Sequence, residues 1–223
     1  MKPLRTVLFD LDGTLLDTAG DMTYALNRLR EKHQLPELAL KDVRSTVSLG
    51  ARGLISLGMN IDESHQHFSK HIEDFLELYA EHATLTTQLF EGMDSVLKFL
   101  EQQDIPWGVV TNKPSRFTFD ILKFLELECR AACIVCGDTL AKRKPDPDTI
   151  LHACSLMQRE PSDCVYIGDS LVDVSAAKSS GMPCLIALYG YIPTTEDPFA
   201  WRANGYVREA TDIIDWLKAN PIT

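Results

Sequence analysis

The sequence has no long apolar run and no excess of positive charge. None of its uninterrupted apolar segments reaches the length of a signal-peptide core or a bilayer-spanning helix, which predicts a cytoplasmic protein. Its 22 lysine and arginine residues are outnumbered by 32 acidic residues, so the net charge is −10. Because nucleic acids and anionic membranes attract basic surfaces, we expect neither as a partner. A small anionic substrate remains compatible, since a bound cation can reverse the charge of a local site.

The sequence also lacks a second cysteine pair that could complete a zinc site. Cys133 and Cys136 have the spacing of half such a site, but their segment has the composition of a strand, on which residues three apart face opposite sides. We therefore expect reduced, mostly buried thiols. Internal repeats and low-complexity tracts are absent too, and 223 residues suffice for a core domain with a smaller insertion. The sequence gives no indication of the oligomeric state.

Short apolar runs alternate with amphipathic segments along most of the chain. This alternation predicts an α/β fold with a Rossmann-like parallel sheet and helices on both faces. The expected strands are Thr6–Phe9, Trp107–Val110, Ala132–Val135, Val165–Ile167 and Cys184–Ala187. The expected helices of this core are Met93–Gln103, Arg116–Leu125, Asp148–Met157 and Val172–Ser180.

The segment from about Ala19 to Leu89 breaks the alternation, because it contains helical patterns and no convincing strand. We expect an α-helical cap inserted into the core, so that residues 1–17 and 90–223 form the core and residues 18–89 the cap. Hinges are expected near Leu15–Thr18 and Thr86–Gly92. The expected cap helices are Met22–His33, Leu40–Val47, Gly53–Leu57 and Glu63–His82.

Two aspartates one residue apart, Asp10 and Asp12, end the first apolar run in the segment VLFDLDGTLLDT. A calcium-binding EF-hand loop is excluded, because the later ligand and glycine positions would hold Thr14, Leu15 and Asp21. A plain surface turn is the simplest alternative. However, two acids at the end of a buried strand repel each other without a cation, and ligands of parallel sheets bind beyond the carboxyl ends of strands. This position therefore favours a functional site.

The segment Asp-Leu-Asp-Gly-Thr closely resembles the first motif of the haloacid dehalogenase-like phosphohydrolases. Three further segments resemble the remaining motifs of that family, in the same order. They are VVTNKP (Val109–Pro114), KRKPDP (Lys142–Pro147) and VYIGDSLVDVSAAKSSG (Val165–Gly181). Together the four motifs cover nearly the whole expected core, and no catalytic position departs from the family pattern.

The resemblance implies a magnesium-dependent phosphatase that works through an aspartyl-phosphate. Asp10 would be the nucleophile, and Asp12 would act first as the general acid and then as the base. The resemblance gives the Mg²⁺ ligands as the Asp10 side chain, the Asp12 backbone carbonyl and the Asp169 side chain. Hard oxygen ligands of this kind suit magnesium better than zinc.

The same resemblance assigns roles to four more residues. Thr111 and Asn112 would hydrogen-bond the transferring phosphoryl group, although they also fit a helix N-terminal turn. Lys144 would balance the negative charge, whereas a solvated surface lysine is the ordinary interpretation of such a basic run. Asp173 would support the cation site through water or Lys144, and otherwise it is an acid at a helix start.

The expected cap would select a small phosphorylated substrate, and an insertion after the first motif resembles the phosphoglycolate phosphatase group. Arg52 could contact a substrate carboxylate or phosphate, or it could be a solvated surface residue. Lys113 and Arg116 are weaker candidates for this contact. Tyr189 or Tyr191 could line the rim, although buried core tyrosines are the simpler interpretation. The resemblance leaves 2-phosphoglycolate and N-acetylmuramic acid 6-phosphate open as substrates.

Other functions compete with the phosphatase hypothesis. A phosphomutase of the same superfamily would pass the phosphoryl group to a sugar hydroxyl instead of water. A dehalogenase is disfavoured, because its carboxylate attacks carbon and needs no cation site. A binding protein that retains only the fold is disfavoured as well, since binding does not require both a nucleophile and an acid.

Overall fold

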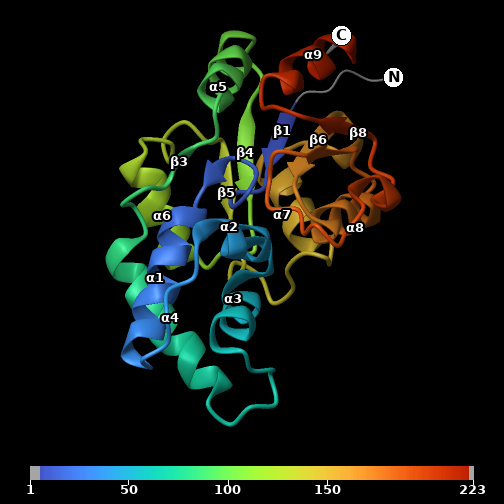
Figure 1. Ribbon diagram of the computed structural model, residues 1–223. Helices are drawn as coiled ribbons and strands as arrows, with labels where there is room; N and C mark the ends of the chain where they lie inside the picture. Colours follow the sequence, from blue (N-terminus) through green and yellow to red (C-terminus); the bar gives the residue numbers. More distant parts are fainter. Residues whose placement is uncertain (1–5, 221–223) are drawn as a thin grey trace.

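The computed structural model describes residues 6–220 and has a six-stranded parallel sheet at its centre (Figure 1). The strand order is β5-β4-β1-β6-β7-β8, so the N-terminal strand lies in the interior of the sheet. The strands are β1 (Thr6–Phe9), β4 (Trp107–Val110), β5 (Cys133–Val135), β6 (Cys164–Gly168), β7 (Cys184–Ala187) and β8 (Gly205–Val207). This confirms the predicted α/β fold with a parallel, Rossmann-like sheet.

Alternate residues of the strands enter two separate hydrophobic clusters, one on each face of the sheet. In β1, Val7 and Phe9 belong to the larger cluster and Leu8 to the smaller one, and all three are fully buried. Burial on both faces explains why the strands read as continuous apolar runs. The helices of this part of the chain are α5 (Met93–Gln102), α6 (Ser115–Phe124), α7 (Asp148–Leu156), α8 (Leu171–Ser180) and α9 (Asp212–Ala219), with short 3-10 helices η2 (Pro161–Asp163) and η3 (Pro198–Trp201).

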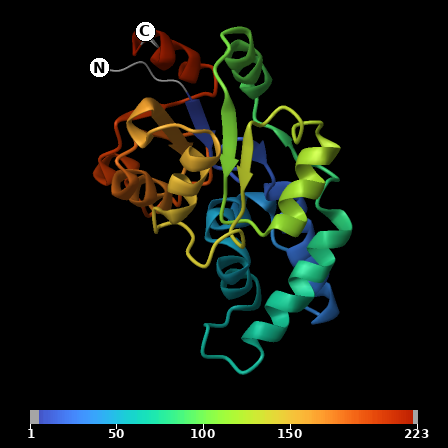
Figure 2. The same cartoon turned by 180° about the vertical axis from the view of Figure 1, so that it is seen from behind.

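The helices that follow β1 in the chain form a bundle beyond the carboxyl ends of the strands (Figures 1 and 2). They are α1 (Ala19–Lys32), α2 (Leu40–Val43), the 3-10 helix η1 (Arg44–Leu49), α3 (Gly50–Met59) and α4 (Phe68–His82). Within residues 6–220, no helix is both long enough and apolar enough to cross a membrane. We use the term cap for residues 18–89; its independence from the core remains a prediction.

The two connections between the cap and the rest of the chain pair with each other. The short strand β2 (Leu16–Asp17) is antiparallel to β3 (Gln88–Leu89), with Leu16 opposite Leu89 and Asp17 opposite Gln88. The prediction of an insertion without strands was therefore wrong at β3. Both strands lie within the ranges expected for the hinges.

Two predicted cap helices differ from the structure. The range Leu40–Val47 was expected as one helix, but α2 gives way to η1, and Gly50 with φ 65° starts α3 in a new direction. The range Glu63–His82 is helical only from Phe68. Before it, the Asp62 carboxylate accepts the Ser64 backbone N–H at 2.9 Å, a local turn that competes with the helix. In the core, β8 and α9 were not predicted.

Candidate active site

Asp10 and Asp12 lie in the tight turn that follows β1. The turn requires Gly13, which has φ 88°, a conformation that residues with a Cβ atom rarely adopt. A Cβ atom on Gly13 would lie 2.1 Å from Oδ2 of Asp169. The glycine therefore allows the first motif and the fourth motif to approach each other closely.

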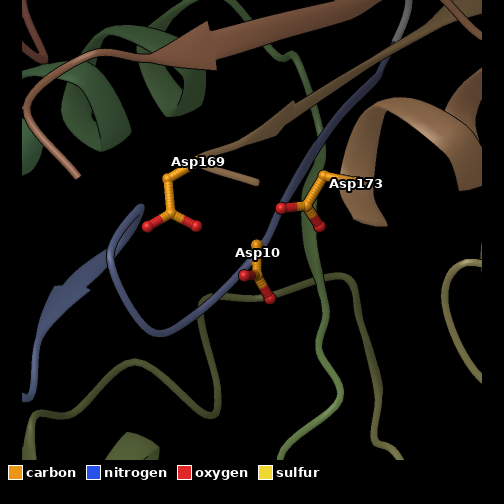
Figure 3. Close-up of side chains that lie close together, drawn as sticks. All are labelled: Asp10, Asp169 and Asp173. Atoms are coloured by element: carbon orange, nitrogen blue, oxygen red, sulfur yellow. The ribbon is translucent and has the colours of Figure 1, made fainter. Parts of the chain in front are cut away.

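Three carboxylates meet at this edge of the sheet. Asp10 follows β1, Asp169 follows β6, and Asp173 lies in the first turn of α8 (Figure 3). Each offers an oxygen atom, and these atoms lie within 4.8 Å of one another. Burial raises the pKa of Asp10 to about 7, although Lys144 opposes the shift, and burial with the neighbouring acids raises the pKa of Asp169 well above its usual range. Burial and the neighbouring acids therefore disfavour the ionised form of both carboxyls where no further positive charge is present.

Lys144 is buried at the centre of this cluster. Its Nζ atom donates to Asp10 Oδ1 at 2.9 Å, to Asp173 Oδ1 at 2.7 Å and to the Tyr166 hydroxyl at 2.6 Å. Burial alone would lower the pKa of Lys144, but the two carboxylates outweigh it and raise the pKa above its ordinary value. The side chain is only 2% exposed, which excludes the alternative of a solvated surface lysine for Lys144.

Asp173 caps the start of α8 in addition to its contact with Lys144. Its Oδ2 accepts the Ser170 backbone N–H at 3.1 Å, and the Ser170 hydroxyl accepts the Asp173 N–H, which forms a capping box at the start of α8. Its other oxygen, Oδ1, accepts Lys144 at 2.7 Å. Asp173 is thus both an acid at a helix start and a charge partner of the cluster.

Asp12 lies on the cap side of the site and pairs with a second lysine, Lys113. Lys113 Nζ lies 3.0 and 3.2 Å from the two carboxylate oxygens of Asp12, and the Thr18 hydroxyl donates to Oδ1 at 2.6 Å. The same Nζ lies 4.7 Å from the centre of the Tyr79 ring on α4. Burial alone would lower the pKa of Lys113, yet Asp12 and Tyr79 raise it above its ordinary value.

A cavity of about 490 Å³ lies between the cluster and the cap. Asp10, Asp12, Thr111, Asn112 and Lys113 line its floor. Its cap wall is largely apolar and is formed by Met22, Val47, Ile72, Phe75, Leu76 and Tyr79, with Phe117 of the core. The cavity therefore combines a charged floor with an apolar wall, as small-molecule sites commonly do.

The remaining predicted residues lie farther out or are engaged elsewhere. Arg52 lines the cavity rim, where it is 59% exposed and pairs with Glu63 at 2.5 Å. Arg116 is exposed, stacks over the Phe117 ring at 4.4 Å and is not among the cavity-lining residues. Tyr189 donates its hydroxyl to the Thr14 carbonyl at 3.1 Å.

The residues at the site that were not predicted from the sequence include Tyr166 and Ser48. The Tyr166 hydroxyl on β6 accepts a hydrogen bond from Lys144 Nζ at 2.6 Å and donates to the Val110 carbonyl at 2.8 Å. Because a buried tyrosine usually has a hydrogen-bond partner for its hydroxyl, a tyrosine within this apolar strand could have indicated a polar contact beneath the site. Ser48 of η1 donates to Asp169 Oδ2 at 2.9 Å, and nothing in its local sequence indicated this contact.

The site fits a divalent cation. Asp169 Oδ1 is buried and has no hydrogen-bond partner within the described chain, although the pKa of its carboxyl is raised by burial and by two neighbouring acids. Asp173 is already bonded to Lys144 and Ser170, which leaves Asp10 and Asp169 with oxygens free for a further positive charge. An all-oxygen donor set of this kind suits a hard cation.

The fold and the acidic cluster give an α/β protein with a candidate active site at the carboxyl edge of its sheet, beneath the cap helices. The chain belongs to the haloacid dehalogenase-like hydrolase family, which its residues 7–187 match.

Two similar proteins carry different names. The chain is 36% identical to an N-acetylmuramic acid 6-phosphate phosphatase of Pseudomonas aeruginosa over 214 residues, which cover 96% of this chain and 95% of that protein. It is 38% identical to a phosphoglycolate phosphatase of Xanthomonas campestris over 210 residues, or 94% of each protein.

A solved structure shares the fold. The crystal structure of a predicted phosphoglycolate phosphatase from Haemophilus somnus superposes with a TM-score of 0.85 at 23% identity, and the match covers 97% of this chain and 99% of that one. At this level of identity the likeness supports the fold alone.

Proposed function

We propose that the protein is a magnesium-dependent phosphatase that hydrolyses a small phosphomonoester through an aspartyl-phosphate on Asp10. The observation that carries the proposal is the position of Asp10 and Asp12 at the floor of the cavity, with a separate lysine paired to each. Two carboxylates in different environments suit two different chemical roles. The names of the relatives point to the same reaction class.

Each residue of the floor has a step in this proposal. An Asp10 carboxylate oxygen attacks the phosphorus atom, the ester P–O bond breaks, and Asp12 donates a proton to the leaving oxygen. Water then attacks the phosphorus atom of the aspartyl-phosphate and gives a proton to Asp12. The bond between Asp10 and phosphorus breaks, and inorganic phosphate leaves. Bound Mg²⁺, held by the Asp10 and Asp169 side chains and the Asp12 carbonyl, would supply neutralisation of the charge between carboxylate and phosphoryl group.

The phosphoryl group would be held by residues of the second and third motifs. Thr111 and Asn112 line the cavity together with Asp10, where the Thr111 hydroxyl and the Asn112 backbone N–H would donate to the phosphoryl group. Lys144 Nζ lies 2.9 Å from Oδ1 of Asp10. Donors fixed in advance around the transferring group stabilise the charge that develops in the transition state. Burial of Lys144 excludes water from this contact and so strengthens it.

The size and polarity of the cavity favour the larger of the two substrates. A volume of about 490 Å³ lies in the range of sites for drug-sized ligands, whereas 2-phosphoglycolate has only two carbon atoms. The apolar wall suits the acetyl and lactyl methyl groups of N-acetylmuramic acid 6-phosphate. Arg52, at the rim of the cavity, would form an ion pair with the substrate carboxylate. We therefore propose a carboxylated sugar phosphate as the substrate.

A panel of phosphate esters with Mg²⁺ tests this function. The kcat/KM for N-acetylmuramic acid 6-phosphate is expected to exceed that for 2-phosphoglycolate by at least about tenfold, or about 1.4 kcal/mol of transition-state binding. A higher value for 2-phosphoglycolate would overturn the substrate assignment. Isomer formation from hexose phosphates, without phosphate release from any ester, would establish the phosphomutase instead.

A further inference from the structure

One segment of the cap reaches the acidic cluster directly. Ser48, near the end of η1, donates its hydroxyl to Asp169 Oδ2 at 2.9 Å across 121 positions of sequence. The Tyr191 backbone N–H donates to the same oxygen at 2.7 Å. The other oxygen, Oδ1, is buried and accepts no bond from any residue between 6 and 220. One cap group and one core group therefore orient Asp169, and its second oxygen stays free for a cation.

The same 3-10 helix is fixed to the cap connection by Arg44. The Arg44 guanidinium donates to both carboxylate oxygens of Asp17, at 3.1 and 2.9 Å, and lies 5.0 Å from the centre of the Tyr191 ring. The Tyr191 hydroxyl donates to Asp17 at 2.8 Å and accepts the Thr18 backbone N–H at 2.7 Å. Tyr191 thus connects the start of the cap with the loop that orients Asp169.

Ser48 and Leu49 also form a partition between two cavities. Both residues line the 490 Å³ cavity above Asp10, and both line a second cavity of about 310 Å³ that Asp169 borders from the other side. Movement of η1 away from the core would remove this partition. Asp169 would then exchange a fixed hydroxyl donor for mobile water, and its orientation would be less well defined.

We propose that Ser48 is a positioning residue through which the closed cap orients Asp169, so that cation binding and cap closure favour each other. The inference rests on the proposed function only in requiring a divalent cation at Asp10 and Asp169. Coupling of this kind is reciprocal: a closed cap raises the affinity for the cation, and the cation favours the closed cap by the same factor. Groups that orient metal ligands typically change metal affinity by about 10–100-fold.

The first test is calorimetric titration of the full chain with Mg²⁺ in the absence of substrate. Ser48→Ala is expected to weaken Mg²⁺ binding about tenfold, because the Tyr191 N–H still orients Asp169. Ser48→Thr keeps the hydroxyl and is expected to retain most of the affinity. Ser45→Ala is the matched control, since it removes a hydroxyl from the same 3-10 helix without removing a bond to Asp169.

The second test measures the cap itself by amide hydrogen exchange of residues 44–49. Mg²⁺ is expected to slow exchange of this segment in the wild-type protein and in Ser45→Ala, and to lose that effect in Ser48→Ala. If Ser48 only stabilised the cap, Ser48→Ala would change the exchange rate by the same factor with and without Mg²⁺, and this result would overturn the inference. Wild-type Mg²⁺ affinity in Ser48→Ala, or Mg²⁺-independent exchange in the wild type, overturns the inference.

Asp169→Asn separates this inference from the proposed cation site. Loss of Mg²⁺ binding in Asp169→Asn together with a normal Ser48→Ala variant overturns the coupling and leaves the proposed function intact. Equal binding by wild type and Asp169→Asn overturns the cation site, and the inference with it. Weakened binding in both variants supports both proposals.

Discussion

At the scale of single residues, the site is governed by the competition between burial and pairing around Asp10. Burial raises its pKa to about 7 even though Lys144 lies 2.9 Å away. Because the unfolded chain ionises this carboxyl at its ordinary value of 3.8, stability is lost as the pH rises from 3.8 to about 7, and above that range the buried carboxylate costs the full difference. Such an arrangement is typical of functional residues rather than of residues that stabilise a fold.

Asp10→Asn is therefore expected to remove activity without weakening the fold. Turnover should fall by at least about 1,000-fold, equivalent to ~4 kcal/mol, because an amide cannot form the acyl-phosphate. In metal-free buffer at pH 8, the midpoint of urea unfolding should be no lower than that of the wild type. Activity within tenfold of the wild type would remove Asp10 as the nucleophile.

Lys144→Met is expected to have the opposite effect on stability. It leaves Asp10 and Asp173 buried without their cation, and breaking a buried pair typically costs about 3–5 kcal/mol. Urea unfolding at pH 8 measures the loss. Lys142→Met, in the same motif but 62% exposed, is the control and should change stability by less than about 0.5 kcal/mol. Equal effects of the two variants would contradict the buried arrangement.

At the scale of secondary-structure elements, strand register brings the motifs together. Phe9 is opposite Val109 on one side and Ile167 on the other. The residues that follow these positions therefore leave the sheet at the same edge, which places Asp10, Thr111 and Asp169 around one space. The cap helices then close that space, and α3 brings Arg52 to its rim.

Arg52→Ala tests whether α3 contributes to substrate choice. We expect kcat/KM to fall about tenfold for a carboxylated ester and less than twofold for an aryl phosphate, because only the former offers a second anion. Steady-state kinetics with both substrates measures the difference. Equal losses would indicate that Arg52 does not contact the carboxylate and only pairs with Glu63.

Secondary structure was predicted best from the sequence where the local residue pattern and the tertiary environment favour the same element. Four of the five expected strands, β1, β4, β6 and β7, are buried throughout, so their apolar composition alone identified them. The half-exposed strand β8 has only three residues, and pairing with β7 rather than composition stabilises it. The Ser48–Asp169 contact spans 121 positions, and a serine in a polar segment carries no sign of such a partner. Contacts of this kind depend on how the cap sits on the sheet.

At the scale of the whole molecule, the bundle of cap helices covers the carboxyl end of the sheet (Figures 1 and 2). The acidic cluster lies inside, with Asp169 only 1% exposed and Asp173 fully buried. Excess negative charge in such a position opposes folding unless a cation accompanies it. Metal content is therefore expected to affect the stability of the entire chain as well as its activity.

Removal of metal with a chelator should abolish hydrolysis and lower the midpoint of thermal unfolding. Restoring Mg²⁺ to 100 times its dissociation constant should return about 2.7 kcal/mol of stability. Calcium is not expected to restore full activity, because its longer and more variable coordination misplaces the nucleophile. Calorimetry with parallel phosphate-release assays measures both effects. Undiminished hydrolysis after chelation would contradict a metal-dependent reaction.

The antiparallel pair of β2 and β3 has a consequence for how the active site opens. Because the entering and leaving connections are hydrogen-bonded side by side, they act as a single two-stranded ribbon rather than as two independent tethers. Sliding the two strands past each other would break their pairing, whereas bending the ribbon across its face would keep it. We expect the cap to swing about one axis, so that substrate enters and product leaves along one direction.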